Sequence, residues 1–219
     1  MNMSIVITRR GLLWLLAGFV AGTWLGLPEA RATPQPDPIR LNEILADPAS
    51  DWDGSGAYHS RDDEWVEIVN TGTSVVDLSA YRLAGADTTW RYEFSGFLDP
   101  GQVRVVYGSE SYAWEQANGH PAFGLRLSNS GGTLLLFRLG PSDTTQVDCY
   151  TYLDHEADDD RSTGRAPDGA AEWRVFDAIN LYSGTTPPLA TACSPSPGAK
   201  VSCPTPVETT TWGRLKRGS

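Results

Sequence analysis

Short runs of β-branched and aromatic residues, separated by turn signals, recur along most of this chain and constrain its fold more than any other feature. The turn signals return roughly every 8–12 residues, as in Leu98-Asp99-Pro100-Gly101 and Ser128-Asn129-Ser130-Gly131-Gly132. Such spacing is typical of an all-β antiparallel sandwich or barrel. A single helical turn is indicated, at residues 113–118. The expected strands are residues 39–45, 64–70, 75–83, 89–94, 102–107, 133–139 and 146–153.

The first 32 residues have the pattern of an export signal and are not expected to be part of the fold. The pair Arg9-Arg10 precedes an uncharged apolar run, residues 11–27, and Ala30-Arg31-Ala32 is a small-x-small cleavage site. The apolar run is shorter than the roughly 20 residues that span a bilayer comfortably. We therefore expect residues 1–32 to be a signal peptide that is removed, which leaves no stable membrane span.

Two export routes fit the same signal. Residues 8–13, Thr-Arg-Arg-Gly-Leu-Leu, match a twin-arginine motif, and two ordinary arginines of a general secretion signal explain them as well. Either route delivers the mature chain to the periplasm, to the cell surface or to the medium.

The acidic composition restricts the partners of the mature chain. The formal net charge is −10, and it becomes −12 after cleavage because three arginines and one glutamate leave with the signal. Nucleic acid and anionic membrane surfaces repel such a chain, and the two lysines, Lys200 and Lys216, form no basic stripe. Cations, proteins and cell-surface polymers are the partners that this charge permits.

The mature chain divides by composition into three parts. Residues 33–182 hold the strand pattern and have the size of one domain with one core. Residues 183–210 are rich in proline, serine and threonine, which predicts an extended linker. Residues 211–219 form a basic tail with Trp212, either a frayed end or a docking peptide for a partner. We expect the signal and the Pro/Thr/Ser-rich C-terminal tail to be disordered.

Three cysteines remain in the chain, an odd number. An exported protein meets an oxidising compartment, so we expect one disulfide and one free thiol. Cys193 and Cys203 close a short loop in a Pro/Ser-rich segment and are the favoured pair; the alternative joins Cys149 to Cys193 and staples the tail to the domain. Unpaired, Cys149 would share a strand face with Val147 as a small buried apolar residue.

An acidic loop between two expected strands has the spacing of a calcium loop. Across residues 51–62, oxygen ligands fall at positions 1, 3, 5, 7 and 12, and Gly56 occupies position 6. Calcium loops of extracellular modules bind weakly, at about 10⁻⁴–10⁻³ M. Asp63 or Glu64 is an alternative for the last position, and a solvated acidic loop is the alternative without a metal. The candidate ligands are Asp51, Asp53, Ser55, the backbone carbonyl of Ala57, and Asp62.

Several aromatic residues fall in expected loops, where an apolar core is not built. Exposed Trp and Tyr rings on a β-sandwich can act as platforms for sugar rings, which predicts an alternative carbohydrate-binding site that uses Trp52 and Trp114. The other interpretation is that these rings pack over the ends of the loops.

Signatures of catalysis are missing from the sequence. The three histidines have no metal-site spacing, and neither a G-x-S-x-G elbow nor a phosphate loop is present. Glu43 and Glu67 could in principle form a glycosidase-like carboxylate pair. Strand alternation instead predicts two exposed glutamates on an outer sheet face. We expect no enzymatic activity.

Six blocks follow one another along residues 39–175: L-N-E-I-L-A-D-P, E-W-V-E-I-V-N, V-V-D-L-S-A-Y-R-L, L-D-P-G-Q-V-R-V-V, L-S-N-S-G-G-T-L-L-L-F and R-S-T-G-R-A-P-D-G. Together, and in this order, they resemble the bacterial lamin-tail domain family. The resemblance implies an immunoglobulin-like β-sandwich in an exported, non-catalytic module, often found in cell-surface proteins or beside hydrolases. One departure is Ala80-Tyr81, where the family usually has Gly-Trp. Tyr81 can fill the same core position if its hydroxyl reaches a partner.

The sequence thus predicts an exported, non-enzymatic interaction module of the cell envelope or the extracellular space, stabilised by calcium. The alternatives are a carbohydrate-binding sandwich and, from the family context alone, an accessory module to exported hydrolases or nucleases.

Overall fold

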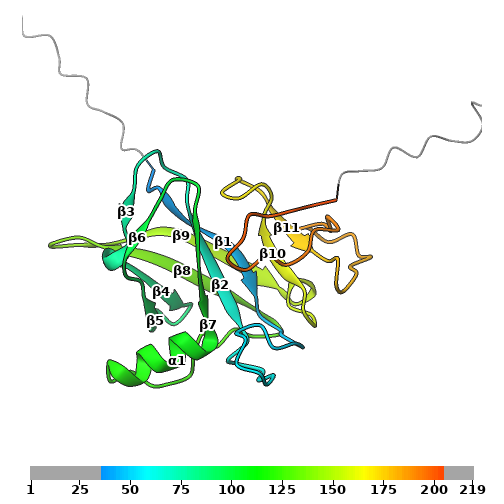
Figure 1. Cartoon of the computed structure of the whole chain (residues 1–219), viewed down its shortest axis with the longest axis horizontal. Coiled ribbons are helices and arrows are strands. Elements are labelled where there is room, and N and C mark those ends of the chain that lie inside the picture. Colours follow the sequence, from blue (N-terminus) through cyan, green and yellow to red (C-terminus); the bar gives the residue numbers. More distant parts are fainter. Residues whose placement is uncertain (1–35, 205–219) are drawn as a thin grey trace, which may run out of the picture. The chain divides into compact units, whose positions relative to one another are not determined.

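The computed structural model describes residues 36–204. Its strands form a five-stranded sheet of order β11-β10-β1-β2-β7, a four-stranded sheet of order β5-β4-β8-β9 and a small β3-β6 pair, drawn in Figure 1. All pairings between named strands are antiparallel. The elements are β1 (Ile39–Leu45), β2 (Trp65–Asn70), β3 (Val76–Asp77), η1 (Leu78–Ala80), β4 (Tyr81–Gly85), β5 (Trp90–Glu93), β6 (Phe97–Leu98), β7 (Val103–Tyr107), α1 (Gly108–Ala117), β8 (Gly131–Leu139), β9 (Thr144–Leu153), η2 (Asp154–Glu156), β10 (Ser162–Arg165) and β11 (Trp173–Phe176).

The main core contains inward side chains of both sheets. Alternation along each strand sends every second side chain to the same face, so apolar residues two apart meet in the interior. The expected all-β, immunoglobulin-like antiparallel sandwich is therefore confirmed. Among the buried side chains of this core are Ile39, Leu41 and Ile44 of β1, Val66 and Ile68 of β2, Leu83 of β4, Val106 of β7, Leu134 and Leu136 of β8 and Tyr152 of β9.

The strand expected at residues 75–83 is interrupted. The side chain of Asp77 accepts a hydrogen bond from the amide of Ser79 and begins the short helix η1, after which β4 starts at Tyr81. Tyr81 is buried in the core, and its hydroxyl donates to Oδ1 of Asp37 at 2.9 Å. The hydroxyl therefore has the partner that a buried tyrosine needs.

Helix α1 is longer than the single turn expected from the sequence, because tertiary contacts hold it. The amide of Gly108 donates to the carbonyl of Glu64 at 2.7 Å, and the carboxylate of Glu110 accepts from the amide of Tyr107 at 3.1 Å. In the middle of the helix, the fully buried Glu115 lies 3.4 Å from the guanidinium of Arg91 on β5. These contacts join the helix to the β1–β2 loop and to the four-stranded sheet.

Residues 183–203 are not the extended linker predicted from their composition. After β11 the chain turns back beside β10 and β11, which Figure 1 shows in orange. Val175 donates its amide to Leu189 and accepts from the amide of Thr191, and a parallel bridge joins Val175 to Ala190. The structured part of the chain thus continues well past residue 182.

The expected signal peptide, residues 1–32, and the basic tail, residues 211–219, lie outside the described residues. Within residues 36–204, no helix is long and apolar enough to cross a membrane.

Replacing Gly108 with alanine is expected to lower the free energy of unfolding by about 1–3 kcal/mol, as overpacking does. A Cβ at this position would overlap the carbonyl oxygen of Arg61, which is backbone and cannot swing aside. Urea denaturation of the mature chain measures the effect. The control Gln116→Ala, on the exposed side of α1, should stay within about 0.5 kcal/mol. A Gly108→Ala protein as stable as the wild type would show that the loop and the helix are not in this contact.

Candidate functional site

The acidic loop between β1 and β2 folds around the carboxylate of Asp63. Asp63 is fully buried; its Oδ1 accepts from the amides of Trp52 at 2.6 Å and Asp53 at 2.9 Å. Its Oδ2 accepts from the amide of His59 at 2.7 Å. A carboxylate that accepts several backbone hydrogen bonds fixes the conformation of the loop around it. Asp63 therefore organises the loop from within.

Three aspartates of this loop bring oxygens together. One carboxylate oxygen from each of Asp51, Asp53 and Asp63 lies within 4.8 Å of the others. Burial alone would raise the pKa of Asp53, but hydrogen bonds from Ser109 and Ser55 outweigh it and hold this pKa below its usual range. Ionised, closely spaced oxygens are the ligands that hard cations such as Ca²⁺ prefer.

Glycines let the loop turn tightly enough to bring these oxygens together. Gly54 and Gly56 have φ of +72° and +91°, in the left-handed region that other residues adopt rarely. With this turn, the amide of Gly56 donates to Oδ2 of Asp51 at 2.8 Å. The amide of Ser55 donates to Oδ1 of Asp53 at 2.9 Å.

The ligand set expected from the sequence is only partly brought together. Asp51 and Asp53 join the cluster, whereas Asp62 points elsewhere and pairs with Nδ1 of His59 at 3.4 Å. Its neighbour Asp63 takes its place. The hydroxyl of Ser55 donates to the carbonyl of Ala57 at 3.0 Å, so these two expected ligands bind each other.

Asp160 is a residue of this region that sequence reasoning missed. It follows two exposed aspartates, Asp158 and Asp159, but is itself only 7% exposed. Its Oδ1 accepts from the amide of Ala49 at 2.7 Å and from the indole N–H of Trp52 at 2.7 Å. Asp160 therefore ties the start of the acidic loop to the segment before β10. No sequence signal distinguished Asp160 from the two aspartates before it.

The two tryptophans proposed as a sugar platform have partners inside the chain. Trp52 lies over Trp65, with ring centroids 6.1 Å apart, and Trp114 of α1 stacks on His120 at 5.0 Å. The two rings belong to different elements, Trp52 to the acidic loop and Trp114 to helix α1. Both instead pack over loop ends.

A hollow of about 330 Å³ lies beside the acidic loop. Tyr112 and Phe123, each 42% exposed, stand on its α1 side. The other wall is made by His59, Arg61 and Asp62 of the loop itself. Exposed aromatic rings at the edge of a hollow are a common feature of surfaces that bind partners.

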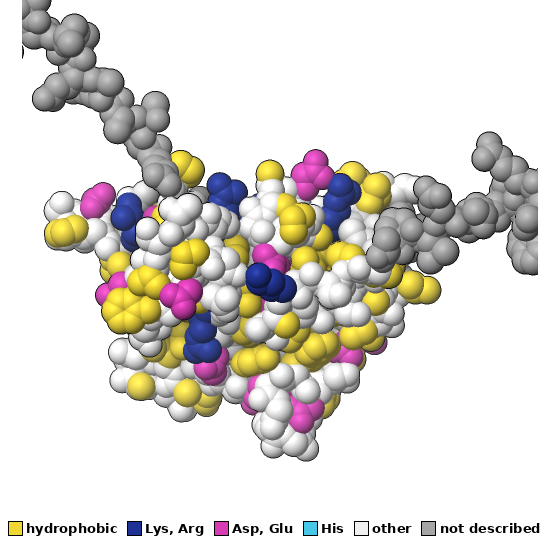
Figure 2. Space-filling view, turned by 45° about the horizontal axis from the view of Figure 1, so that its top comes forward, with side chains coloured by type: hydrophobic (Ala, Val, Ile, Leu, Met, Phe, Trp, Pro, Cys, Tyr) yellow, Lys and Arg dark blue, Asp and Glu magenta, His cyan; other side chains and the backbone are white. Residues whose placement is uncertain are grey.

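On the face in Figure 2, basic side chains stand singly beside acidic ones and form no continuous stripe.

Glu43 and Glu67 are not exposed, contrary to expectation. They are register partners on β1 and β2, and a bulge at Asn42 helps to turn Glu43 to the outer face of the sheet. Residues 193–203 cover this face, so that each glutamate is at most 1% exposed. Burial raises the pKa of Glu43 to about 8 and that of Glu67 to about 7. The pair is closed to a substrate in this structure.

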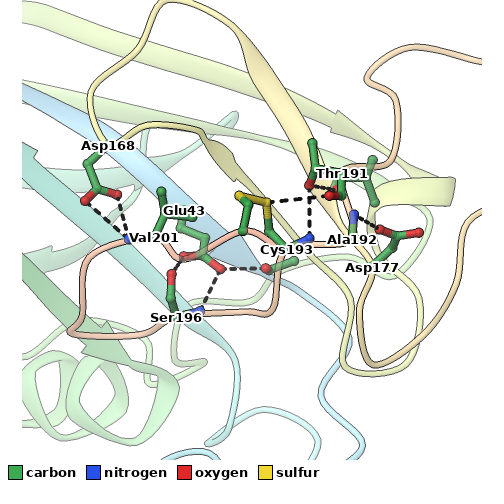
Figure 3. The surroundings of a disulfide bond; sticks show 11 residues. Glu43, Asp168, Asp177, Thr191, Ala192, Cys193, Ser196 and Val201 are labelled. Atoms are coloured by element: carbon green, nitrogen blue, oxygen red, sulfur yellow. Dashed lines mark hydrogen bonds between the residues drawn. A yellow bond between two sulfur atoms is a disulfide. The ribbon is translucent and has the colours of Figure 1, made fainter. Parts of the chain in front are cut away.

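The cysteines form one disulfide, between Cys193 and Cys203 (Figure 3). Cys149 is free and exposed on β9, opposite Leu135 of β8. The expectation that Cys149 is a small buried residue is therefore wrong. Its side chain faces away from the core because Tyr150 and Tyr152 fill the inner face of the strand.

Comparison with known proteins gave one family. The model of the Lamin Tail Domain matches residues 32–154, more than half of the chain. No curated protein and no solved structure matches the chain. The match covers β1 through β9 and includes the acidic loop, whereas β10, β11 and the disulfide loop lie beyond it. The chain therefore belongs to the lamin tail domain family.

Proposed function

We propose that this protein is an exported, non-enzymatic interaction module whose acidic loop binds calcium. The observation that carries the calcium part is the convergence of oxygens from Asp51, Asp53 and Asp63. An intramolecular disulfide supports export, because such bonds persist in oxidising compartments. Membership of a family of immunoglobulin-like domains supports an interaction role.

Calcium would act on this loop by relieving repulsion. Three carboxylates held within 4.8 Å repel one another, and a divalent cation between them replaces that repulsion with attraction. The loop contacts α1 through the amides of Gly108 and Ser109, which donate to Glu64 and Asp62. A loop fixed by calcium would therefore fix one wall of the hollow beside Tyr112 and Phe123.

The partner in this proposal is a protein or a cell-surface polymer that contacts the hollow and its aromatic edge. Tyr58 on the loop is 52% exposed, and Tyr112 and Phe123 add two further exposed rings. Tyrosine and phenylalanine bury large areas with few rotatable bonds, which suits a binding surface. The acidic net charge makes nucleic acid an unsuitable partner.

Calcium titration of the mature chain should give a dissociation constant of about 10⁻⁴–10⁻³ M by calorimetry. At 10 mM calcium the corresponding stabilisation is about 1.4–2.7 kcal/mol, visible as a rise in Tm. Asp51→Asn and Asp53→Asn should each remove most of the heat and the Tm shift. Asp63 is left intact because it also holds the loop amides.

The matched control for the calcium site is Asp62→Asn. Asp62 lies in the same loop and was expected to be a ligand, but it pairs with His59 outside the cluster. This variant should bind calcium like the wild type. The proposal fails if the wild type shows neither heat nor a Tm shift, or if Asp62→Asn loses binding as completely as Asp51→Asn.

Export of the protein gives a second expectation, which does not depend on calcium binding. Expressed at full length, the chain should accumulate outside the cytoplasm and begin at Thr33, which N-terminal sequencing reads directly. Replacing Arg9 and Arg10 by lysine should stop export by a twin-arginine route and leave general secretion nearly unchanged. A cytoplasmic protein that keeps residues 1–32 would contradict this part of the proposal.

A further inference from the structure

The disulfide loop, residues 193–203, is attached to the five-stranded sheet through carboxylates; we call this loop the strap. Ser196 donates its amide to Oε1 of Glu43 at 3.1 Å and its hydroxyl to Oε2 at 2.8 Å. Gly198 donates its amide to Oε2 of Glu67 at 2.8 Å. Figure 3 shows the strap lying over the side chain of Glu43. The hydrogen bonds that Ser196 and Gly198 donate therefore attach the strap to two acidic side chains, those of Glu43 and Glu67.

The sheet holds the same carboxylates from the other side. The hydroxyl of Ser162 donates to Glu43 at 2.6 Å, and Nδ2 of Asn42 donates to Glu67 at 2.6 Å. Asn42 also donates to Asp168 at 3.0 Å, and the amide of Val201 in the strap lies 3.4 Å from both oxygens of Asp168. Strap and sheet thus share one set of acceptors.

The charged and titratable groups around this pair offer little compensation for negative charge. Glu67 from β2 raises the pKa of Glu43, and Asp168 from the turn after β10 raises that of Glu67. Tyr107 of β7 faces Glu67, whereas Ser162 of β10 and Phe176 of β11 carry no charge near Glu43. The strap itself contributes Lys200, whose side chain is exposed to solvent.

Hydrogen bonds from Ser196 and Gly198 of the strap favour the charged form of the two glutamates, but burial outweighs them and opposes ionisation. The pKa of each lies above its ordinary value of 4.5, at about 8 for Glu43 and about 7 for Glu67. A carboxyl group whose folded pKa is raised stabilises the covered state fully below pH 4.5 and loses that contribution as pH rises through 7 and 8. Lifting the strap would let water reach both carboxylates, so ionisation favours the lifted state.

We propose that residues 193–203 are a pH-controlled strap, docked on β1 and β2 while Glu43 and Glu67 retain protons and released when both ionise. The hinge is the chain before Cys193, which stays fixed because Ala192 donates to Asp177 at 2.7 Å and Cys193 accepts from Ala178 at 3.0 Å. The disulfide keeps Cys203 beside the fixed Cys193, so release lifts the middle of the loop, around Ser196 and Gly198, off the sheet. The released state therefore uncovers Glu43 and Glu67 on the outer face of β1 and β2.

The disulfide makes docking easier without joining the strap to the sheet. It closes a loop of ten-residue separation and keeps the amides of Ser196 and Gly198 in one spacing. A loop that is already restricted loses less conformational freedom when it binds. The bond therefore acts on docking at every pH, whereas the glutamates make docking depend on pH.

Trypsin cleavage after Lys200 tests the strap in the mature chain. Lys200 is the single lysine among residues 36–204, and a docked strap must detach locally before a protease can bind it. From pH 6 to pH 9, the cleavage rate at Lys200 should rise about tenfold or more after correction for the activity of trypsin on a peptide. Cleavage after the buried Arg165, followed in the same samples by mass spectrometry under reduction, should stay slow.

Variants identify the groups responsible. Glu43→Gln and Glu67→Gln keep hydrogen-bonding side chains of similar size but cannot ionise, so each should flatten the pH dependence at Lys200. The control Glu93→Gln alters a partly exposed glutamate of the other sheet and should keep the wild-type profile. Circular dichroism melting at pH 6 verifies that every variant folds. A wild-type rate independent of pH, a rise equal at Arg165, or an unchanged rise in both glutamine variants would overturn the proposal.

Removing the disulfide separates its role from that of the glutamates. The double variant Cys193→Ser/Cys203→Ser should cleave about tenfold faster at Lys200 at both ends of the pH range, because the open loop loses more freedom on docking. Its rate should still rise with pH by the wild-type factor. A double variant that loses the pH dependence would contradict the assignment of that dependence to Glu43 and Glu67.

Discussion

Strand β2 is buried on both faces, and much of the structure is arranged to cover it. All six of its residues are buried. Val66 and Ile68 face the core between the sheets, while Trp65 and Glu67 face outward. Antiparallel sheets commonly leave one face to water, so a strand covered on both sides needs further chain above it. The acidic loop covers Trp65 with Trp52, and the strap covers Glu67.

The two covers use different physical interactions. At Trp65 the contact is apolar and the loop is fixed by buried Asp63 and by Asp160, both of which accept backbone hydrogen bonds. At Glu67 the contact is polar, and the covering chain supplies the donors. A buried carboxyl group with partners on two sides is stable only while both sides stay in place. The loop over Trp65 is thus held by hydrogen bonds to Asp63 and Asp160, whereas the strap over Glu67 is the part that we propose responds to pH.

Local sequence patterns predicted the strands well and their burial poorly. The expected strand at residues 39–45 coincides with β1, and Glu43 and Glu67 lie on the outer face as expected. Glu43 reaches that face through the bulge after Leu41, because strict alternation from Ile39 and Leu41 would turn it inward. The burial of these two glutamates could not be predicted from the strand pattern, because the residues that cover them lie more than 120 positions away in the chain. Helix α1 was underestimated for a related reason: the Arg91–Glu115 contact and the Gly108 hydrogen bond leave no periodic pattern in the helix sequence.

In the acidic loop, residue spacing located the candidate metal site but did not assign all of its ligands. Spacing identified the loop and two of its three clustered aspartates, but it could not decide between Asp62 and Asp63. Adjacent residues point in different directions, and the choice depends on how the chain turns at Gly54 and Gly56. Spacing rules derived for one loop geometry therefore locate a candidate site more reliably than they assign its ligands.

The course of residues 189–203 changes where this domain ends. By composition the fold stops near Tyr182, yet a protein shortened there would lose the partners of Val175, Asp177, Glu43 and Glu67 at once. It would expose the carboxyl groups of Glu43 and Glu67 on an open sheet face and would aggregate or unfold more readily than its sequence suggests. The contacts that hold this segment to the sheet run as far as Val201, and the disulfide extends the attached part to Cys203. Anything grafted onto the protein belongs after that residue.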